Sequence, residues 1–201
     1  MKLYFTPGVC SLASHIALRE AGAEFKLVQV NLQTKQTANG DDYLKLNRSG
    51  KVPALDFGEA EVLTESAAIL QYIADRFPEA QLAPPVGTTA RYRLQSRLSY
   101  LGSELHKLFG PLFIPGHSEE AKQASIAKIH DHLGVLDSEL AARDYLLESG
   151  FSVADAYLFT ILGWPRLVGV ETDQYSNLGA YAGRIAARAS VQAALAAEGL
   201  I

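Results

Sequence analysis

The chain has 201 residues, a formal net charge of −4 at pH 7, 48% hydrophobic residues and 20% charged residues, as in an ordinary globular protein of one large or two modest domains. The negative charge and the lack of a basic run argue against a nucleic-acid partner, and no apolar run reaches the roughly 20 residues of a membrane span. The single cysteine excludes an internal disulfide. Because Pro7-Gly8 interrupts the N-terminal segment before a signal-peptide core could form, we expect a cytoplasmic protein.

The first 22 residues predict a strand, a turn and a helix. Residues 3–5 are apolar and partly aromatic, which favours a strand, and Pro7-Gly8 is a turn signal. Apolar residues then recur at helical spacing from Ser11 to about Ala21-Gly22. Cys10 is therefore predicted at a helix N-terminus.

This position has a chemical consequence for Cys10. The first turn of a helix presents unpaired N–H groups and the positive end of the helix dipole, and both stabilise an anion such as a thiolate. A free cysteine has a pKa of about 8.5, and a helix N-terminus is one of the environments that lowers it. The competing interpretation is that a lone cysteine is a small buried apolar residue.

The remainder of the first 78 residues continues the alternation of strands and helices. Alternating apolar residues predict a strand at 25–30, and a polar stretch after it ends in a short helix at 43–46. Residues 54–57 and 62–63 form a predicted hairpin, and a helix at 66–77 stops at Pro78. The predicted element order is βαβ-α-ββα.

The second half of the chain carries only helical patterns. Residues 79–87 are proline-rich and weakly patterned, which predicts a linker between a domain at 1–78 and an all-helical domain at 88–201. Ser152 and Asp155 have the spacing of a helix-capping motif. The predicted helices are a leucine-striped one from 88 to about 109, one at 119–142, an apolar one starting at 152, and two at 177–188 and 191–197.

In their order and spacing, these features resemble the bacterial beta-class glutathione transferases. The motifs that carry the resemblance span the chain: PGVCSLASHIALRE, NRSGKVPAL, LTESAAILQYIAD, SELHKLFGPLF, FSVADAYLFTILGW and the terminal LAAEGLI. The resemblance implies the glutathione transferase fold, with an α/β thioredoxin-like N-terminal domain and an all-α C-terminal domain. It also implies a glutathione site between the two domains, a homodimer and a cis peptide bond at Val52-Pro53.

The resemblance assigns residues to this site. It implies that Cys10, Ser11 and His106 stabilise the catalytic sulfur. The implied glutathione-binding residues are Lys35, Val52, Pro53, Glu65, Ser66, Ser99, Ser103 and Lys107. A carboxylate beside donors at a helix start suits an amino-acid head group, and backbone groups before a proline suit pairing with a peptide.

Each assignment has a plainer alternative. Glu65-Ser66 could be an ordinary helix cap, and Lys35 could be a solvated charge in a polar loop. Ser99, Ser103 and His106 are spaced i, i+4, i+7, which places them on one side of a helix, and such a row is usually only solvated. His130 and His132 point to different faces of their helix, so no metal site is expected.

Three functions remain open from the sequence. The first is glutathione transfer to a small hydrophobic electrophile, as in detoxification, with glutathione next to Cys10 and able to form a mixed disulfide with it. The second is thiol–disulfide exchange or reductive dehalogenation with Cys10 as nucleophile. The third is a non-enzymatic interaction module of the same fold. Phe109, Phe113 and Trp164 are either the electrophile site or core.

Overall fold

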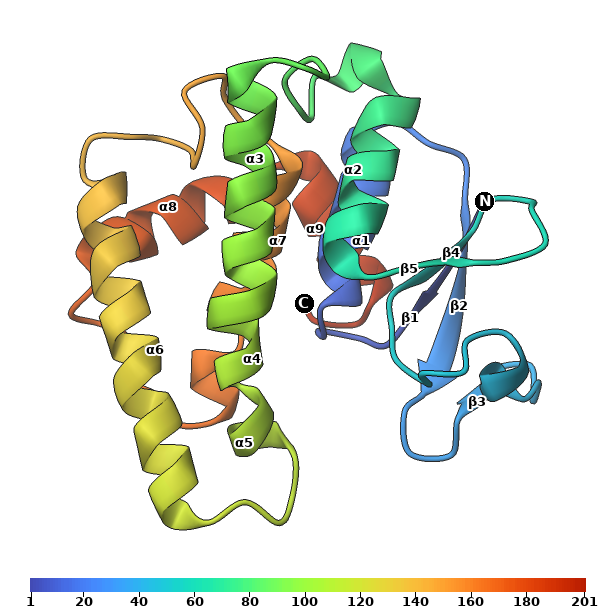
Figure 1. Ribbon diagram of the computed structural model, residues 1–201, viewed down its shortest axis with the longest axis horizontal. Coiled ribbons are helices and arrows are strands. Elements are labelled where there is room, and N and C mark those ends of the chain that lie inside the picture. Colours follow the sequence, from blue (N-terminus) through green and yellow to red (C-terminus); the bar gives the residue numbers. More distant parts are fainter. The chain divides into compact units, whose positions relative to one another are not determined.

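The structure is a computed structural model that describes all 201 residues. The chain divides into two compact units. The first consists of Met1–Ala83 together with Arg188–Ile201, and the second is Pro84–Ala187 (Figure 1).

The first unit is built on a mixed five-stranded sheet of order β3-β2-β1-β4-β5. β1 pairs in parallel with β2 and antiparallel with β4, and the outer strands β3 and β5 are both antiparallel to their neighbours. The strands are β1 (Lys2–Phe5), β2 (Lys26–Asn31), β3 (Gln36–Thr37), β4 (Ala54–Asp56) and β5 (Leu63–Thr64).

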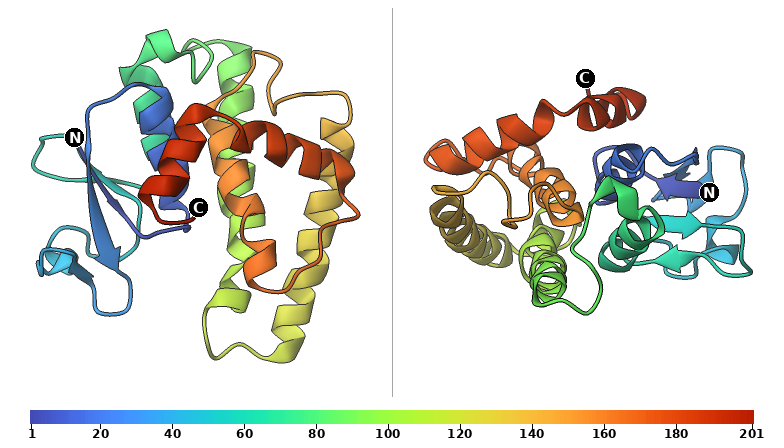
Figure 2. Two further views of the ribbon diagram at one scale, coloured as in Figure 1. Left: turned by 180° about the vertical axis from the view of Figure 1, so that it is seen from behind. Right: turned by 90° about the horizontal axis from the view of Figure 1, so that it is seen from above.

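The two faces of this sheet are covered differently. Helices α1 (Ser11–Glu20) and α2 (Ser66–Arg76) lie together on one face, as the right-hand view of Figure 2 shows. On the other side, the 3-10 turn Tyr43–Lys45 places Tyr43 in a buried cluster with Tyr4 of β1. Because side chains alternate along a strand, β1 contributes to the core on both of its faces.

The predicted order of strands and helices in this unit is confirmed, with one addition. β3 arises from the polar stretch after β2, where no strand was predicted. It is only two residues long and pairs Val30 with Thr37 and Asn31 with Gln36. Such a short edge strand buries too little apolar surface to give an alternating pattern.

Helix α9 (Ala189–Ala197) belongs to the first unit, which differs from the predicted extent of the helical domain at 88–201. It packs on α1. Glu20, near the end of α1, accepts hydrogen bonds from Arg188 Nε at 2.5 Å and Nη2 at 3.0 Å, and also from the Ser190 hydroxyl. The sequence gives the helix but not its partner, because its apolar face could pack on either unit.

The second unit is entirely helical, as predicted. α7 is almost wholly buried, and this agrees with its apolar sequence. The helices are α3 (Thr89–Tyr100), a π-helical segment Leu101–Leu105, α4 (His106–Leu108), α5 (Gly110–Phe113), α6 (Glu119–Leu140), α7 (Val153–Leu162) and α8 (Ser176–Ala186).

A buried carboxylate organises the start of α7. Asp155 accepts hydrogen bonds from the Ser152 N–H and hydroxyl, both at 2.8 Å, and from the Leu146 N–H and the Tyr181 hydroxyl, both at 2.9 Å. The predicted capping motif at Ser152 and Asp155 is therefore confirmed. Burial raises the pKa of Asp155, although the four donors oppose that shift.

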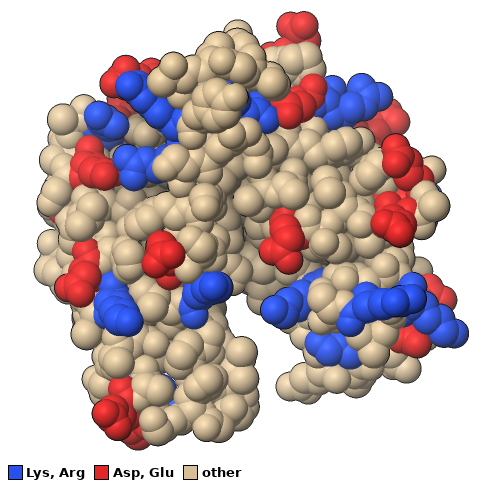
Figure 3. All heavy atoms as spheres, in the orientation of Figure 1, with Lys and Arg blue, Asp and Glu red and all other residues tan.

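The surface mixes both charge signs over most of the face in Figure 3, except that basic side chains gather around β3 and the 3-10 turn. The segment from 35 to 51 carries Lys35, Lys45, Arg48 and Lys51. None of the helices has the length and hydropathy required to cross a bilayer. No cluster of three or more His, Cys, Asp or Glu side chains is arranged to hold a metal ion.

Candidate functional site

Cys10 occupies the N-cap position of α1, directly after the turn that follows β1. The turn is held at its base by Thr6, whose N–H donates to the Ser11 hydroxyl at 3.2 Å while the same hydroxyl donates to the Thr6 carbonyl at 3.1 Å. Gly8 adopts a φ of +72°, which only glycine accepts readily, and this brings the chain round into the helix. The predicted strand, turn and helix are confirmed, and so is the position of Cys10 at the helix N-terminus.

Burial, and not the helix N-terminus, dominates the environment of the Cys10 thiol. Its Sγ donates a hydrogen bond to the Val52 carbonyl at 3.1 Å, so the sulfur carries a proton. The side chain is partly exposed, yet burial of the sulfur raises the pKa of the thiol to about 11. Hydrogen bonds from the Ser66 hydroxyl and from the N–H groups at the helix start lower the pKa but do not outweigh burial. A helix N-terminus alone therefore does not ionise this thiol.

Two segments of the first unit meet Cys10. The peptide bond between Val52 and Pro53 is cis, as the resemblance implies. Both residues are buried, and they directly precede β4. Ser66, the first residue of α2, is also buried and bonds to the Cys10 sulfur. The structure therefore places Cys10, Val52 and Ser66 together.

Glu65 does not act as an ordinary helix cap. It occupies the N-cap position of α2 with a φ of +67°, a left-handed conformation that is unfavourable for a residue with a Cβ. Its side chain makes no capping hydrogen bond and is exposed, while its carbonyl accepts the first helical bonds from Ala68 and Ile69. The carboxylate is thus presented to solvent at a helix start, where a ligand ammonium could meet it.

Lys35 is not a freely solvated charge. It adopts a φ of +58°, and its Nζ donates to the Gly50 carbonyl at 2.9 Å. The side chain packs close to Gly50, so it ties the polar loop after β2 to the segment before Val52. This structural role, which the sequence did not indicate, is compatible with an ammonium at the edge of a binding site.

In the second unit, His106 is embedded in an aromatic cluster. Its Nδ1 lies 2.7 Å from the Tyr157 hydroxyl, and its ring centroid lies 4.7 Å from that of Trp164. Trp164 also contacts Phe109 and Phe113, at centroid distances of 5.3 and 6.2 Å. Phe109 and Trp164 are 1% and 4% exposed and belong to the core, whereas Phe113 is 46% exposed.

The row of Ser99, Ser103 and His106 does not lie on a regular α-helix. The π-helical segment Leu101–Leu105 separates Ser99 from His106, and its wider turn changes the relative direction of the two side chains. Ser99, Ser103 and Lys107 are exposed, while His106 is partly buried. The Ser103 hydroxyl donates to Glu104 at 3.1 Å. Sequence spacing alone could not show the π-helix.

Sequence reasoning missed Tyr157, the residue that orients His106. It lies within the apolar run of α7, where its hydroxyl needs a partner from another element. The other hydroxyl of this helix, that of Thr160, donates to the Ala156 carbonyl of the same helix. The need for a partner outside the helix is the signal that could have identified Tyr157. Tyr157 is 2% exposed, so its hydroxyl could not be satisfied by bulk water.

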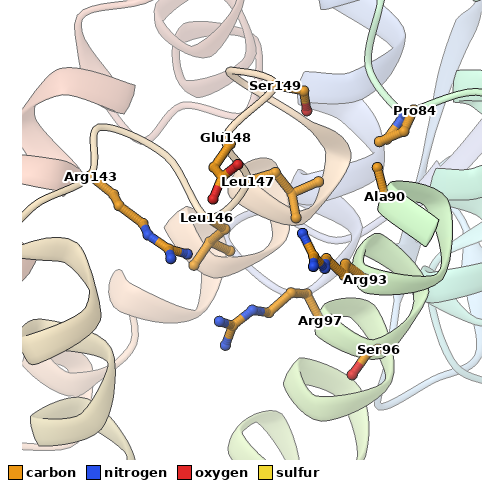
Figure 4. Close-up of a pocket in the computed structure, with 10 residues that line it drawn as sticks. All are labelled: Pro84, Ala90, Arg93, Ser96, Arg97, Arg143, Leu146, Leu147, Glu148 and Ser149. Carbon is orange, nitrogen blue, oxygen red and sulfur yellow. The ribbon is translucent and has the colours of Figure 1, made fainter. Parts of the chain in front are cut away.

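A separate pocket of about 470 Å³ lies in the second unit between α3 and the loop that precedes α7. Figure 4 shows Arg93 and Arg97 projecting from α3 and Arg143 from the loop. Arg97 is paired with Glu139 at 2.7 Å. None of the residues predicted for the glutathione site lines this pocket.

Comparisons with known proteins agree with this architecture. Residues 1–75 match the model of the glutathione S-transferase N-terminal domain, and residues 119–184 match that of the C-terminal domain. The chain is 44% identical over 200 residues to the glutathione S-transferase GstA of Escherichia coli O157:H7, with 100% of both chains covered.

Solved structures show the same likeness over the whole chain. A bacterial beta-class glutathione S-transferase of Sphingomonas chungbukensis superposes with a TM-score of 0.97 at 59% identity, covering 100% of each chain. A sphingomonad glutathione S-transferase in complex with glutathione also has a TM-score of 0.97, at 56% identity and the same coverage.

Proposed function

Because this chain belongs to the bacterial beta class of the glutathione S-transferase family, we propose that it transfers glutathione to small hydrophobic electrophiles. Glutathione is the co-substrate in this proposal, and no metal takes part. In the first unit Glu65 and Ser66 would bind its amino-acid head group, the Val52 backbone its cysteinyl part, and Lys35 its glycine carboxylate.

One observation carries the choice of chemistry: the Cys10 thiol is a hydrogen-bond donor. Its pKa of about 11 keeps it protonated at neutral pH, and its proton is directed at an acceptor, the Val52 carbonyl. A protonated thiol is a poor nucleophile, but it can donate to a neighbouring thiolate. We therefore assign the nucleophilic sulfur to glutathione and a donor role to Cys10.

The proposed transfer needs no oxidant or reductant. Glutathione binds and loses its thiol proton to solvent, and its thiolate is stabilised by donation from the Cys10 thiol and from the backbone N–H of Ser11, whose hydroxyl is already bonded to Thr6. The thiolate attacks the electrophilic carbon, so that a carbon–sulfur bond forms while the bond to the leaving group breaks. With an aryl halide, the halide leaves with the bonding electron pair.

The second unit is proposed to act through His106. A hydrogen bond between Nδ1 and Tyr157 fixes the orientation of the imidazole ring, as a group that contributes to a reacting centre requires. We propose that His106 stabilises the glutathione sulfur, and that Lys107, Ser99 and Ser103 contribute to glutathione binding. The exposed Phe113 is the aromatic residue of this unit best suited to meet an electrophile.

The alternative with Cys10 as nucleophile requires its thiolate. At a pKa of about 11, only a small fraction of Cys10 is ionised at pH 7 to 8, so thiol–disulfide exchange and reductive dehalogenation through Cys10 would be slow. A mixed disulfide between Cys10 and glutathione would form by attack of the Cys10 thiolate on glutathione disulfide with release of one glutathione, and therefore mainly at alkaline pH. A purely non-enzymatic role would not account for the hydrogen-bond donors that surround the Cys10 sulfur.

An activity panel with the purified protein tests the proposal. Glutathione is offered with 1-chloro-2,4-dinitrobenzene, hydroxyethyl disulfide, cumene hydroperoxide and a chlorinated aromatic acid. We expect the aryl halide to be conjugated fastest. A faster reaction with the disulfide or the chlorinated acid would instead favour Cys10 as nucleophile, and failure to bind immobilised glutathione would favour the interaction module.

We further propose that the protein is a homodimer that acts in detoxification in the cytoplasm, where glutathione is kept reduced. Exposed Tyr92 on α3 and Val135 on α6 are large apolar side chains of the kind that association would cover. Gel filtration is expected to give a mass near twice the 21.7 kDa of the chain. Elution at the mass of a single chain would contradict the dimer.

A further inference from the structure

The end of the chain lies against the turn that leads into Cys10. Helix α9 closes with a hydrogen bond from the Leu200 N–H to the Leu195 carbonyl at 2.9 Å and one from Gly199 to Ala196 at 3.1 Å. With Gly199 at a φ of +69°, this is a Schellman motif, which reverses the chain direction. We call residues 198–201 the C-terminal tail.

The tail contacts Gly8 in two independent ways. The Gly8 N–H donates to Glu198 Oε2 at 2.9 Å. The Leu200 side chain covers the same residue, because a Cβ placed on Gly8 would lie 3.4 Å from Leu200 Cδ2. Gly8 is two residues before Cys10, so both contacts act on the backbone that carries the thiol.

The Glu198 carboxylate is completely buried and has a second partner. Its Oε1 lies 2.8 Å from His15 Nδ1, and His15 Nε2 lies 2.8 Å from Arg19 Nε. Arginine can only donate, so Nε2 must accept and the His15 proton must reside on Nδ1, where it is donated to Glu198. One chain of hydrogen bonds therefore runs from Arg19 through His15 and Glu198 to Gly8.

Packing of α9 on α1 does not by itself require Glu198. The same two helices are joined further along by Glu20, which binds Arg188 and Ser190. That carboxylate touches no backbone group of the turn before Cys10, whereas Glu198 does. Glu20 can therefore serve only the packing of the two helices, whereas Glu198 also holds the turn.

We propose that Glu198 is a positioning residue for the transfer reaction: through Gly8 and His15, the C-terminal tail fixes the turn that places Cys10. The inference rests on the proposed function, because it assumes that Cys10 serves the reaction. Loss of the tail contacts would let the turn open, expose the thiol and remove its donor from the position that glutathione needs.

The test compares Glu198→Gln with the matched variant Glu20→Gln. An amide at 198 is mismatched in either orientation, because its NH₂ group meets the N–H of Gly8 or of His15. If His15 instead moved its proton to Nε2, that N–H would oppose Arg19. Glu20→Gln weakens the contact between the same helices but leaves the turn intact.

The readout is the rate at which iodoacetamide alkylates Cys10, the only cysteine, in the absence of glutathione. We expect Glu198→Gln to raise this rate about tenfold, because a lost hydrogen bond to a charged group shifts the opening of the turn by that order. Glu20→Gln should change it less than about twofold. Similar rates for the two variants would overturn the inference.

Two additions keep the outcome decisive. If Glu198→Gln does not fold, Leu200→Ala, which keeps the buried carboxylate paired, should still raise the alkylation rate about threefold, and an unchanged rate would overturn the inference. Turnover with 1-chloro-2,4-dinitrobenzene is measured in parallel and should fall for Glu198→Gln but not for Glu20→Gln. A wild type without this activity would refute the proposed function, whereas the alkylation rates still report whether the tail holds the turn.

Discussion

The thiol of Cys10 donates a hydrogen bond to the main-chain carbonyl of Val52, 3.1 Å away. This contact joins the turn after β1 to the segment before β4, and it holds the sulfur in its protonated form. The location of that proton separates two chemistries, because a thiol can donate to the sulfur of a bound ligand, whereas a thiolate can attack it.

The first prediction concerns the ionisation of Cys10. Since burial raises the pKa of this thiol to about 11, its alkylation by iodoacetamide should accelerate as the pH rises and approach a plateau only near that value. A pH series of alkylation rates on the free protein measures it. A midpoint at or below about 8.5, the ordinary value for cysteine, would contradict the donor role.

The same measurement on Ser66→Ala isolates one cause of the ionisation. The Ser66 hydroxyl bonds to the sulfur and lowers its pKa, so its removal should shift the midpoint of the profile further upward. Ser49→Ala is a suitable control, because that hydroxyl lies in the loop before Val52 and bonds to Asn47.

The second prediction separates the two activities of the site. Cys10→Ala should retain much of the conjugation of 1-chloro-2,4-dinitrobenzene, within about tenfold of the wild type, because only a donor to the glutathione sulfur is lost. Exchange with hydroxyethyl disulfide should disappear, since it needs a protein sulfur. If both activities were lost together, conjugation would also depend on the Cys10 sulfur as nucleophile, and the donor role would be contradicted.

The third prediction concerns His106 and Tyr157. Tyr157→Phe removes the hydroxyl that lies 2.7 Å from His106 Nδ1 but keeps the buried ring. We expect kcat to fall about fivefold with little change in KM for glutathione, because a hydrogen bond of this kind contributes about 1 kcal/mol. His106→Ala should lower kcat by about 10- to 100-fold, since donors to charged groups contribute more.

Tyr175→Phe provides the control for this pair. Tyr175 bonds to His130 Nδ1 at 3.0 Å in the same unit, and neither residue was predicted for the site. Its kinetics should match those of the wild type. A rise in KM for glutathione without loss of kcat in His106→Ala would show that the residue binds glutathione and does not act on the sulfur.

Local pattern was sufficient to predict much of this fold. The strand, turn and helix around Cys10 and the capped start of α7 follow from turn residues, apolar spacing and the Ser-x-x-Asp motif, all of which act within a few residues. β3 was missed because two residues of an edge strand carry no periodic signal. The unit to which α9 belongs depends on Glu20 and Arg188, which are far apart in the sequence.

The properties of the candidate site were less predictable than its members. The helical pattern correctly placed Cys10 at a helix N-terminus, but burial raises the pKa of its thiol and outweighs the hydrogen bonds from Ser66 and from the N–H groups at the helix start. The π-helical segment changes the spacing argument for His106, and no residue type in it signals a π-turn. The partners Tyr157 and Glu198 lie 51 and 190 positions from His106 and Gly8, beyond any local pattern.

The fourth prediction concerns stability. Asp155 accepts four hydrogen bonds with its two buried oxygens, and all four partners are donors: Leu146 N–H, Ser152 N–H, and the hydroxyls of Ser152 and Tyr181. Asp155→Asn must turn its NH₂ group toward the N–H of either Leu146 or Ser152. The free energy of unfolding should therefore fall by about 2–4 kcal/mol.

Urea unfolding at constant protein concentration measures this change, and Asp137→Asn is the matched control. Asp137 accepts from Asn177 at 3.0 Å and from the Leu178 N–H at 2.9 Å, but it is only partly buried, so water can compensate for its loss. We expect a loss of about 1 kcal/mol there. Equal losses in the two variants would mean that burial of Asp155 adds nothing to the free-energy cost of replacing its carboxylate. Asp155 would then contribute no more than an exposed helix cap does.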